Sequence, residues 1–448
     1  MTGSEDARPG EGFDAAVGAI ESGELAELER RVREFPGLLE FVPEDGQTLL
    51  HKAAGSASLR HDDPGACVRW LLDAGMRPDA GRTGFDTALH FAASLNHVDA
   101  VDALLEAGAP TGCVGGCDDQ ADGGTPLAHA LVYGAARAAD RIAAVAIEPR
   151  NLRVTAGLGR LDLVRDAFAP DGSLKPEARE ARAFYRPHDE FPEWEPSDER
   201  QEILDEALVW AAHNARDDAV LEELIERGAD PSAVPYVASG LHYAAWRGDT
   251  RVVETLLAKG ADASRLDRQY GAPVWSWAAF GGHDELRLRL LEVAAKSCLA
   301  AAVELGSIDD VRRLLDGGAD PNEGLEGHDG PLALARCAGD DAIASLLARR
   351  GATLSLEEAC RLGDLARVVE ALDGEGTGER GAERLSRLAD DAAAAGREEV
   401  ADVLCGRGAV LSPHAAASLG RVEPLEAALQ WIAEQIAGET DAKTGTDG

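Results

Sequence analysis

The sequence predicts an all-α fold, a solenoid in which short helix-turn-helix units stack one on the next. Three observations predict it. A phrase built around Leu-His or Ala-Ala recurs along the chain, an amphipathic phrase follows it, and in the C-terminal half the copies recur at steps of 33 or 34 and of 24 residues. One such unit cannot bury its own apolar face, so neighbouring units must stack.

The first phrase of each unit predicts a short helix. Its clearest copies are TALHFAASLNH (87–97), SGLHYAAWRGD (239–249) and PVWSWAAFGGH (273–283). Thr48, Thr87 and Thr125 stand before such phrases and are good N-cap residues. The Ala-Ala pairs allow helices of neighbouring units to approach closely.

The second phrase predicts an amphipathic helix. Copies read VDAVDALLEAGA (98–109), TRVVETLLAKGADAS (250–264) and DELRLRLLEVAA (284–295). Val and Leu at i, i+3 and i+4 form one apolar stripe. Gly75, Gly108, Gly228 and Gly260 follow these helices, where a left-handed C-cap is expected.

The combined pattern, xxLHxAAxxGHxxxVxxLLxxGADxx, resembles the ankyrin repeat family. The resemblance extends over about residues 13–436, or about thirteen helix pairs. It implies helix pairs joined by β-turn fingers. It also implies that His51, His90 and His242 are structural, each ring bonding the backbone of a neighbouring turn.

The spacing of the units indicates that some fingers are missing. The residue that ends each first helix recurs after Ala215 at Gly248, Gly282, Gly306, Gly339, Gly363, Gly396 and Gly420, at steps of 33, 34, 24, 33, 24, 33 and 24. The longer step matches a full ankyrin unit. The shorter step lacks about nine residues, the size of a finger. We therefore expect alternating fingered and fingerless junctions in the C-terminal half.

The predicted organisation has five parts. They are a disordered head (1–12), N-terminal repeats (13–173), an insertion rich in aromatic residues and proline (174–201), C-terminal repeats (202–436) and a disordered tail (437–448). No remaining stretch approaches the roughly 50 residues of a separate catalytic domain.

Composition narrows the partner class. The 448 residues include 81 acidic and 44 basic side chains, for a net charge of −37. Such a field disfavours nucleic acid and anionic membranes and favours a basic protein partner. The seven cysteines are scattered, and no secretory leader or long apolar run is evident. We therefore expect a cytoplasmic monomer.

The candidate partner-binding residues come from three consecutive units. The resemblance places the two residues before the turn glycine on the concave face. These positions hold His213 and Asn214, then Trp246 and Arg247, then Phe280. Aromatic residues and arginine dominate binding hot spots, although packing between repeats is the competing interpretation. Trp210, Tyr243 and Trp277, one turn earlier, are interpreted as packing residues.

The stretch FYRPHDEFPEWEPSD (184–198) is a second candidate. Its side chains of interest are Phe184, Tyr185, His188, Phe191 and Trp194, and its three prolines exclude a regular helix. Three interpretations stay open: the aromatic residues seal the joint between repeats, they border a ligand surface, or His188 performs acid–base or metal chemistry with its acidic neighbours. The last is disfavoured because adjacent side chains diverge.

No cofactor or metal is expected. The CVGGC segment (113–117) lacks a second pair of zinc ligands nearby, and no phosphate-binding loop or nucleophile elbow occurs. We expect a protein–protein interaction scaffold or adaptor rather than an enzyme. The alternatives are an enzyme or small-molecule sensor with a pocket under the 184–198 loop, and a structural spacer.

Overall fold

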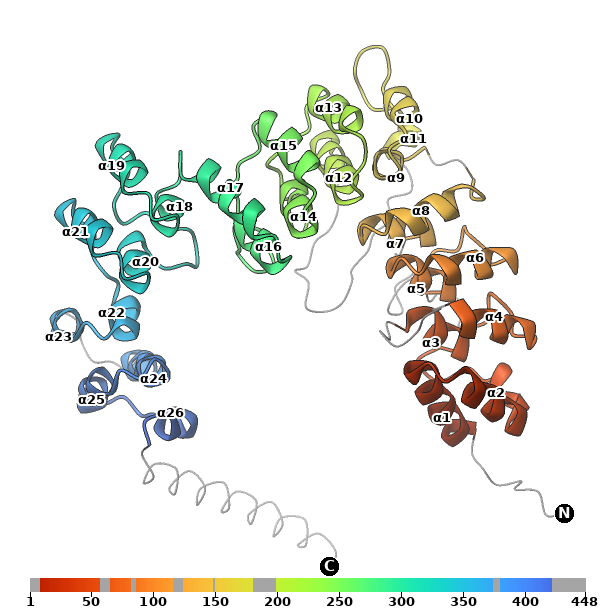
Figure 1. Ribbon diagram of the computed structural model, residues 1–448, viewed down its shortest axis with the longest axis horizontal. Coiled ribbons are helices and arrows are strands. Elements are labelled where there is room, and N and C mark those ends of the chain that lie inside the picture. The colour runs from red at the N-terminus through yellow and green to blue at the C-terminus, as the bar shows by residue number, and fades with distance from the viewer. Residues whose placement is uncertain are drawn as a thin grey trace, which may run out of the picture. The chain divides into compact units, whose positions relative to one another are not determined.

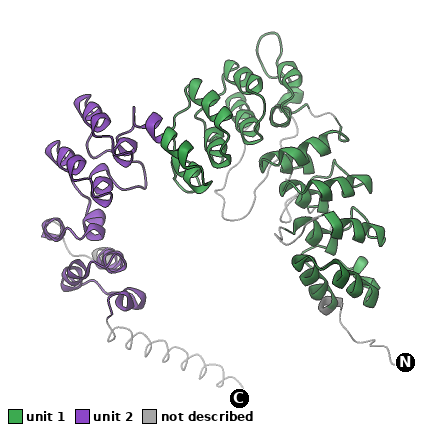
Figure 2. Cartoon of the chain, in the orientation of Figure 1, with its two compact units in different colours: residues 1–290 green, residues 291–448 purple. Residues whose placement is uncertain are grey.

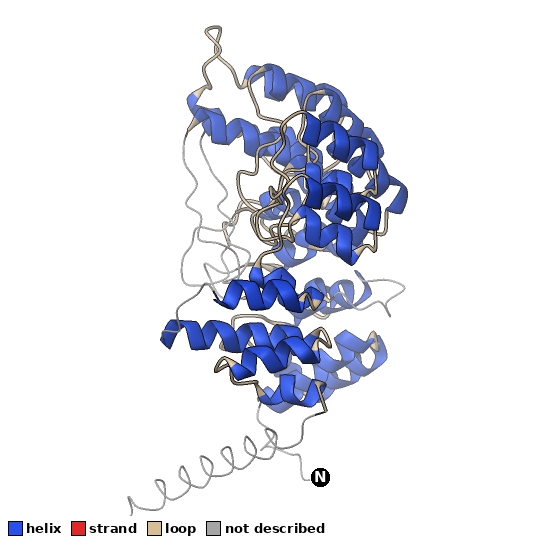
Figure 3. Cartoon of the chain, turned by 90° about the vertical axis from the view of Figure 1, so that its left-hand side faces the viewer, coloured by secondary structure: helices blue, strands red, loops and turns tan. Residues whose placement is uncertain are grey.

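The computed structural model describes residues 9–56, 65–81, 86–115, 124–147, 150–179, 199–373 and 379–420. This part of the chain contains twenty-six α-helices, and its only β-contacts are two isolated bridges (Figure 3). The all-α prediction is therefore confirmed. The predicted tail, residues 180–198 of the predicted insertion and most of the predicted head lie outside the described residues.

The chain forms two compact units, residues 1–290 and 291–448 (Figure 2). Helices follow one another in pairs, of an inner helix and then an outer helix (Figure 1). The inner helices are α1 (Pro9–Ser22), α3 (Leu49–Gly55), α5 (Ala88–Ser94), α7 (Pro126–Val132), α9 (Leu152–Gly157), α12 (Arg200–His213), α14 (Gly240–Arg247), α16 (Val274–Phe280), α18 (Leu299–Glu304), α20 (Pro331–Cys337), α22 (Leu356–Leu362), α24 (Glu379–Ala394) and α26 (Pro413–Ser418).

The outer helices are α2 (Leu25–Glu34), α4 (Gly65–Asp73), α6 (Val98–Glu106), α8 (Ala136–Ala143), α10 (Leu161–Asp166), α13 (Asp218–Glu226), α15 (Thr250–Ala258), α17 (Asp284–Ala294), α19 (Ile308–Asp316), α21 (Asp341–Arg349), α23 (Leu365–Asp373) and α25 (Glu398–Gly406). A 3₁₀ turn, η1 (Pro36–Leu39), and the short helix α11 (Pro176–Arg179) stand outside the pairs.

The turns between inner and outer helices require a left-handed residue. Every turn position in the spacing series from Ala215 to Gly420 has a positive φ. Asn96 and Ala215 are the only residues other than glycine with positive φ in the described ranges, at 57° and 51°. The interval pattern in the sequence therefore marked real turns.

The histidines of the Leu-His phrase are structural, as the resemblance implied. Each ring bonds the N-cap residue of its own helix through Nδ1 and a backbone carbonyl of the next unit through Nε2. Those carbonyls belong to Asp86 for His51, Gly124 for His90 and Ala272 for His242, at 3.0, 3.1 and 3.2 Å. Burial lowers the pKa of each of the three rings to about 4.

Finger length varies as the spacing predicted at most junctions, but the 33-residue step from Gly363 to Gly396 lengthens α24 to 16 residues instead of adding a finger. Residues 259–273 join α15 to α16 and carry the Leu266–Pro273 bridge, whereas only residues 350–355 join α21 to α22. In α22, which follows the short junction, Glu358 stands where the other repeats have the histidine, and it likewise bonds the N-cap backbone and a neighbouring repeat. Its carboxylate accepts the backbone N–H groups of Ser355 and Gly330 and so links the two units.

Small and aliphatic side chains fill the core. The Ala-Ala pairs of α3, α5 and α14 are buried, and so are the Leu and Val stripes of the outer helices. One apolar cluster lies within residues 13–154 and another within residues 295–409. None of the described helices has the length and hydropathy needed to cross a membrane.

Candidate functional site

An irregular contact between helices of residues 1–290 positions the site. Helix α12 packs mainly on α9, but it also reaches α7. The Asn214 side-chain amide donates to the carbonyl of Leu131 at 2.7 Å, and the Arg247 guanidinium donates to that of Gly134 at 2.9 Å. The ends of α12 and α14 are therefore tied directly to the end of α7.

Three neighbouring rings, which we call the aromatic ladder, run from α12 to α16: His213, Tyr243 and Trp277. The rings of His213 and Tyr243 stack with centroids 3.9 Å apart, and Tyr243 meets Trp277 edge-on at 5.5 Å. Trp277 Nε1 donates to Asp267 at 2.8 Å. These contacts support the interpretation of Tyr243 and Trp277 as packing residues.

His213 and Asn214, which we expected to be exposed on a binding surface, are buried. Their exposed fractions are only 5% and 2%, because one ring stacks in the ladder and the other side chain bonds backbone carbonyls of Leu131 and Trp210. Arg247 is exposed, but its guanidinium is partly engaged by Gly134. The structure therefore assigns the first two to the joint between repeats.

Three exposed aromatic side chains, which we call the aromatic rim, lie in the two repeats that follow α12 and α13: Trp246, Tyr270 and Phe280. They are 41%, 70% and 86% exposed. Trp246 and Phe280 hold the same position in α14 and α16, which pack together, and the ring centroid of Tyr270 lies 6.4 Å from that of Trp277. Two of the three were candidates from the sequence alone.

Tyr270 was missed by the sequence reasoning, although a signal existed. Tyr236 and Tyr270 stand in consecutive fingers and are 34 residues apart, the same step that separates Gly248 from Gly282. A ring repeated at the same finger position was therefore visible as soon as the repeats had been aligned.

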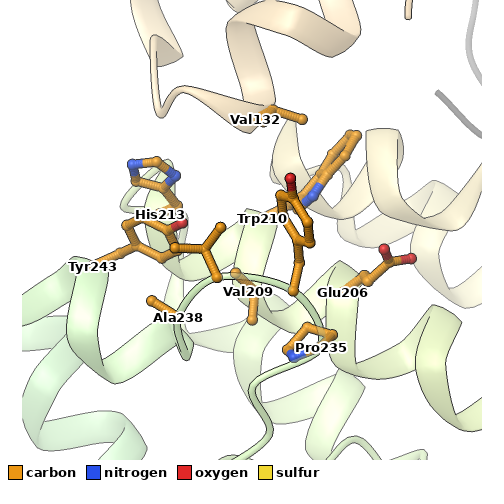
Figure 4. A pocket seen from close by; sticks show the side chains of 10 residues that line it. Val132, Glu206, Val209, Trp210, His213, Pro235, Ala238 and Tyr243 are labelled. Carbon is orange, nitrogen blue, oxygen red and sulfur yellow. The ribbon is translucent and has the colours of Figure 1, made fainter. Parts of the chain in front are cut away.

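A small cavity of about 50 Å³ lies between α12 and the finger before α14 (Figure 4). Its walls include Trp210, Tyr236, Tyr243, His213 and Glu206. Because a water needs about 10–15 Å³ of such space, the cavity has room for only a few waters or one small group.

The polar groups of this cavity are poorly suited to acid–base chemistry. The Glu206 carboxylate is buried and forms an ion pair with Arg153, which ties α12 to α9. Burial, and next the charge of Arg247, lower the pKa of His213 to about 3, so its ring is neutral at physiological pH. The cavity therefore offers a neutral ring and an already neutralised carboxylate.

The aromatic loop candidates cannot be placed beside this cavity. Phe184, Tyr185, His188, Phe191 and Trp194 all lie outside the described residues. The three interpretations of the 184–198 stretch stay predictions.

Comparison with known proteins identifies the repeat. A family model for ankyrin repeats (3 copies) matches residues 28–114, 57–150 and 241–358, which together make up more than half of the chain. A model for ankyrin repeats (many copies) matches residues 208–257. No curated protein matches the sequence.

Similar solved structures include two ankyrin repeat domains. The domain of human ASB11 is 18% identical, covers 61% of this chain and 96% of its own, and superposes with a TM-score of 0.31. The domain of Bcl-3, described as a unique member of the IkappaB protein family, is 22% identical, covers 63% of this chain and all of its own, and has a TM-score of 0.27.

Proposed function

Because the chain belongs to the ankyrin repeat family, we propose that it is a protein–protein interaction scaffold that binds its partner through the aromatic rim. The proposal rests on one observation. Trp246, Tyr270 and Phe280 keep large apolar areas in water on two consecutive units. Large aromatic side chains are frequent among the few residues that carry most of the binding energy at protein interfaces.

The partner that fits this surface carries basic side chains. The net charge of −37 attracts a basic protein over long range. Close to the rim, the exposed Asp284 and Glu285 occupy the first turn of α17, four and five residues after Phe280. Lys and Arg side chains also bind favourably to the faces of Trp and Tyr rings.

A catalytic or small-molecule role is not proposed. The cavity between α12 and the finger before α14 has a volume of about 50 Å³, whereas pockets for small molecules usually enclose about 300–1,000 Å³. A wider, open hollow of about 670 Å³ beside α24 lies far along the sequence from the 184–198 loop, so it does not favour a pocket under that loop.

A capture experiment tests the proposal. The full chain is immobilised, and the partner it retains from an extract of its source cells is identified and purified. The double substitution Trp246→Ala and Phe280→Ala is expected to weaken binding of that partner by about 30-fold or more, since a hot spot contributes about 2 kcal/mol.

The matched control removes two other exposed apolar side chains. Ile147 and Val410 are 94% and 74% exposed, and neither belongs to the rim. The variant Ile147→Ala with Val410→Ala should bind as the wild type does. Equal loss in both variants, or no loss in the rim variant with its circular dichroism unchanged, would refute the assignment.

A further inference from the structure

Three side chains with metal-binding atoms converge between two neighbouring repeats. Asp86 lies just before α5, His90 is in its first turn, and His129 is in α7. One ligand atom from each lies within 4.8 Å of the other two. The convergence arises because α5 and α7 pack side by side.

One oxygen of the Asp86 carboxylate lacks a hydrogen-bond partner. Its Oδ1 is buried without a hydrogen-bond partner, and it lies 3.8 Å from Nε2 of His129, beyond hydrogen-bond range. The backbone closes over it at Gly115, where an added Cβ would collide with Oδ1. A buried carboxylate oxygen without a donor is costly, and a cation bound to it would remove that cost.

Both imidazoles are in the form that binds metals. Burial is the main cause that lowers the pKa of His129 to about 3 and that of His90 to about 4. The two rings meet edge-on, with centroids 4.7 Å apart. Neutral imidazole nitrogens together with one carboxylate oxygen form a donor set suited to zinc and related divalent ions.

We propose that Asp86, His90 and His129 bind one divalent transition-metal ion of the zinc class. The ion would neutralise the buried carboxylate and cross-link the repeat of α5 to that of α7. Water would complete its coordination, because structural and catalytic zinc sites have four or more ligands.

Binding through His90 requires a change of tautomer. In the metal-free protein its Nε2 donates to the carbonyl of Gly124, and its Nδ1 accepts from the backbone N–H of Thr87. With Nε2 on the metal, the ring proton moves to Nδ1 and is donated to the Thr87 hydroxyl, 2.9 Å away. The backbone N–H of Thr87 then loses its acceptor on the ring and the carbonyl of Gly124 loses its donor, and the metal–ligand bonds offset these losses. Metal-bound histidines commonly hold their second nitrogen in this way.

The test uses the untagged, metal-free full chain and the ions Co²⁺ and Zn²⁺. We expect one Co²⁺ per chain, seen by its visible absorption and displaced by Zn²⁺. The melting temperature should rise with either ion, because an ion that binds only the folded state stabilises it.

Asp86→Asn separates a ligand from a residue that only packs. Without metal this variant should melt at the same or a higher temperature than the wild type, because a buried charge has been removed. Its affinity for Co²⁺ should fall at least about tenfold, as should that of His129→Gln.

His242→Gln is the matched control. His242 makes the same kind of N-cap and carbonyl bonds in a later repeat. The variant should lose stability and keep Co²⁺ binding. The proposal is overturned if the wild type binds no Co²⁺, if Asp86→Asn and His129→Gln bind it as tightly as the wild type, or if intense thiolate-to-cobalt absorption shows that cysteines are the ligands.

Discussion

At the residue scale, the turn between the inner and outer helix imposes the strictest demand on side-chain type. A left-handed backbone costs an L-residue about 1–2 kcal/mol, and asparagine tolerates it better than alanine. Nearly all of these turns carry glycine, and one carries Asn96. Ala215, with φ of 51°, is the residue least suited to its turn.

Replacing Ala215 by glycine is therefore expected to stabilise the first unit by about 1 kcal/mol, because glycine adopts this conformation without steric cost. Urea unfolding followed by tryptophan fluorescence measures this, since Trp70, Trp210, Trp246, Trp275 and Trp277 all belong to residues 1–290.

The control for this substitution is Ala348→Gly. Ala348 is exposed in α21, which belongs to residues 291–448. Glycine at this position is expected to lower the free energy of unfolding of that unit by about 1 kcal/mol, and circular dichroism follows its unfolding. A lower urea midpoint for Ala215→Gly would contradict the strain argument.

At the scale of elements, buried histidines join each inner helix to the next finger. The Nδ1 atoms of His51 and His242 accept from the backbone N–H of the N-cap residue. Their Nε2 atoms donate to backbone carbonyls 35 and 30 residues further on, respectively. Both bonds use the neutral ring. Protonation would put a proton on the nitrogen that accepts, so the charged form does not fit the folded state.

Stability is expected to fall with acid between about pH 6.5 and pH 4. An unfolded histidine binds a proton near pH 6.5, whereas burial lowers the folded pKa of His51 and His242 to about 4. Within this window the unfolded state binds more protons, so the free energy of unfolding decreases as the pH falls. Thermal melts across the range measure the effect.

The variant His242→Gln isolates one histidine of this set. It should be less stable than the wild type at pH 7 and should lose less stability on going to pH 5. Parallel stability curves for the two proteins would show that His242 does not contribute to the pH dependence.

At the scale of the whole molecule, the charge excess is the dominant feature. Ion pairs do link successive repeats, such as Arg251 with Asp218 and Arg289 with Glu254. Exposed pairs of this kind contribute little each. A net charge of −37 therefore leaves substantial self-repulsion in the folded chain.

Added NaCl is expected to raise the melting temperature of the chain. At roughly 1 M salt the Debye length is only about 3 Å, so repulsion between exposed carboxylates is screened. Thermal melts in metal-free buffer over a NaCl series measure this. A flat or falling melting temperature would mean that the ion pairs outweigh the repulsion.

Much of the fold could be predicted from the sequence because its signals are local. N-cap residues, turn glycines and the stripes of the outer helices each act within one repeat, and most intervals between glycines report finger length. The exception is the step from Gly363 to Gly396, whose extra residues lie in the long helix α24. The candidate site was only partly predictable. Trp246 and Phe280 were named, Tyr270 was missed, and His213 and Asn214 are buried.

The sequence by itself determined the repeat, its turns, most of its missing fingers and the structural bonds of His51 and His242. Only the tertiary structure decided that α12 contacts α7 as well as α9, which buries Asn214 against α7, and that Trp246 and Phe280 stay in water. It also brought Asp86 next to His129. The reason is physical: repeat signals specify contacts within one unit and with its neighbour, whereas these placements depend on how particular neighbours pack.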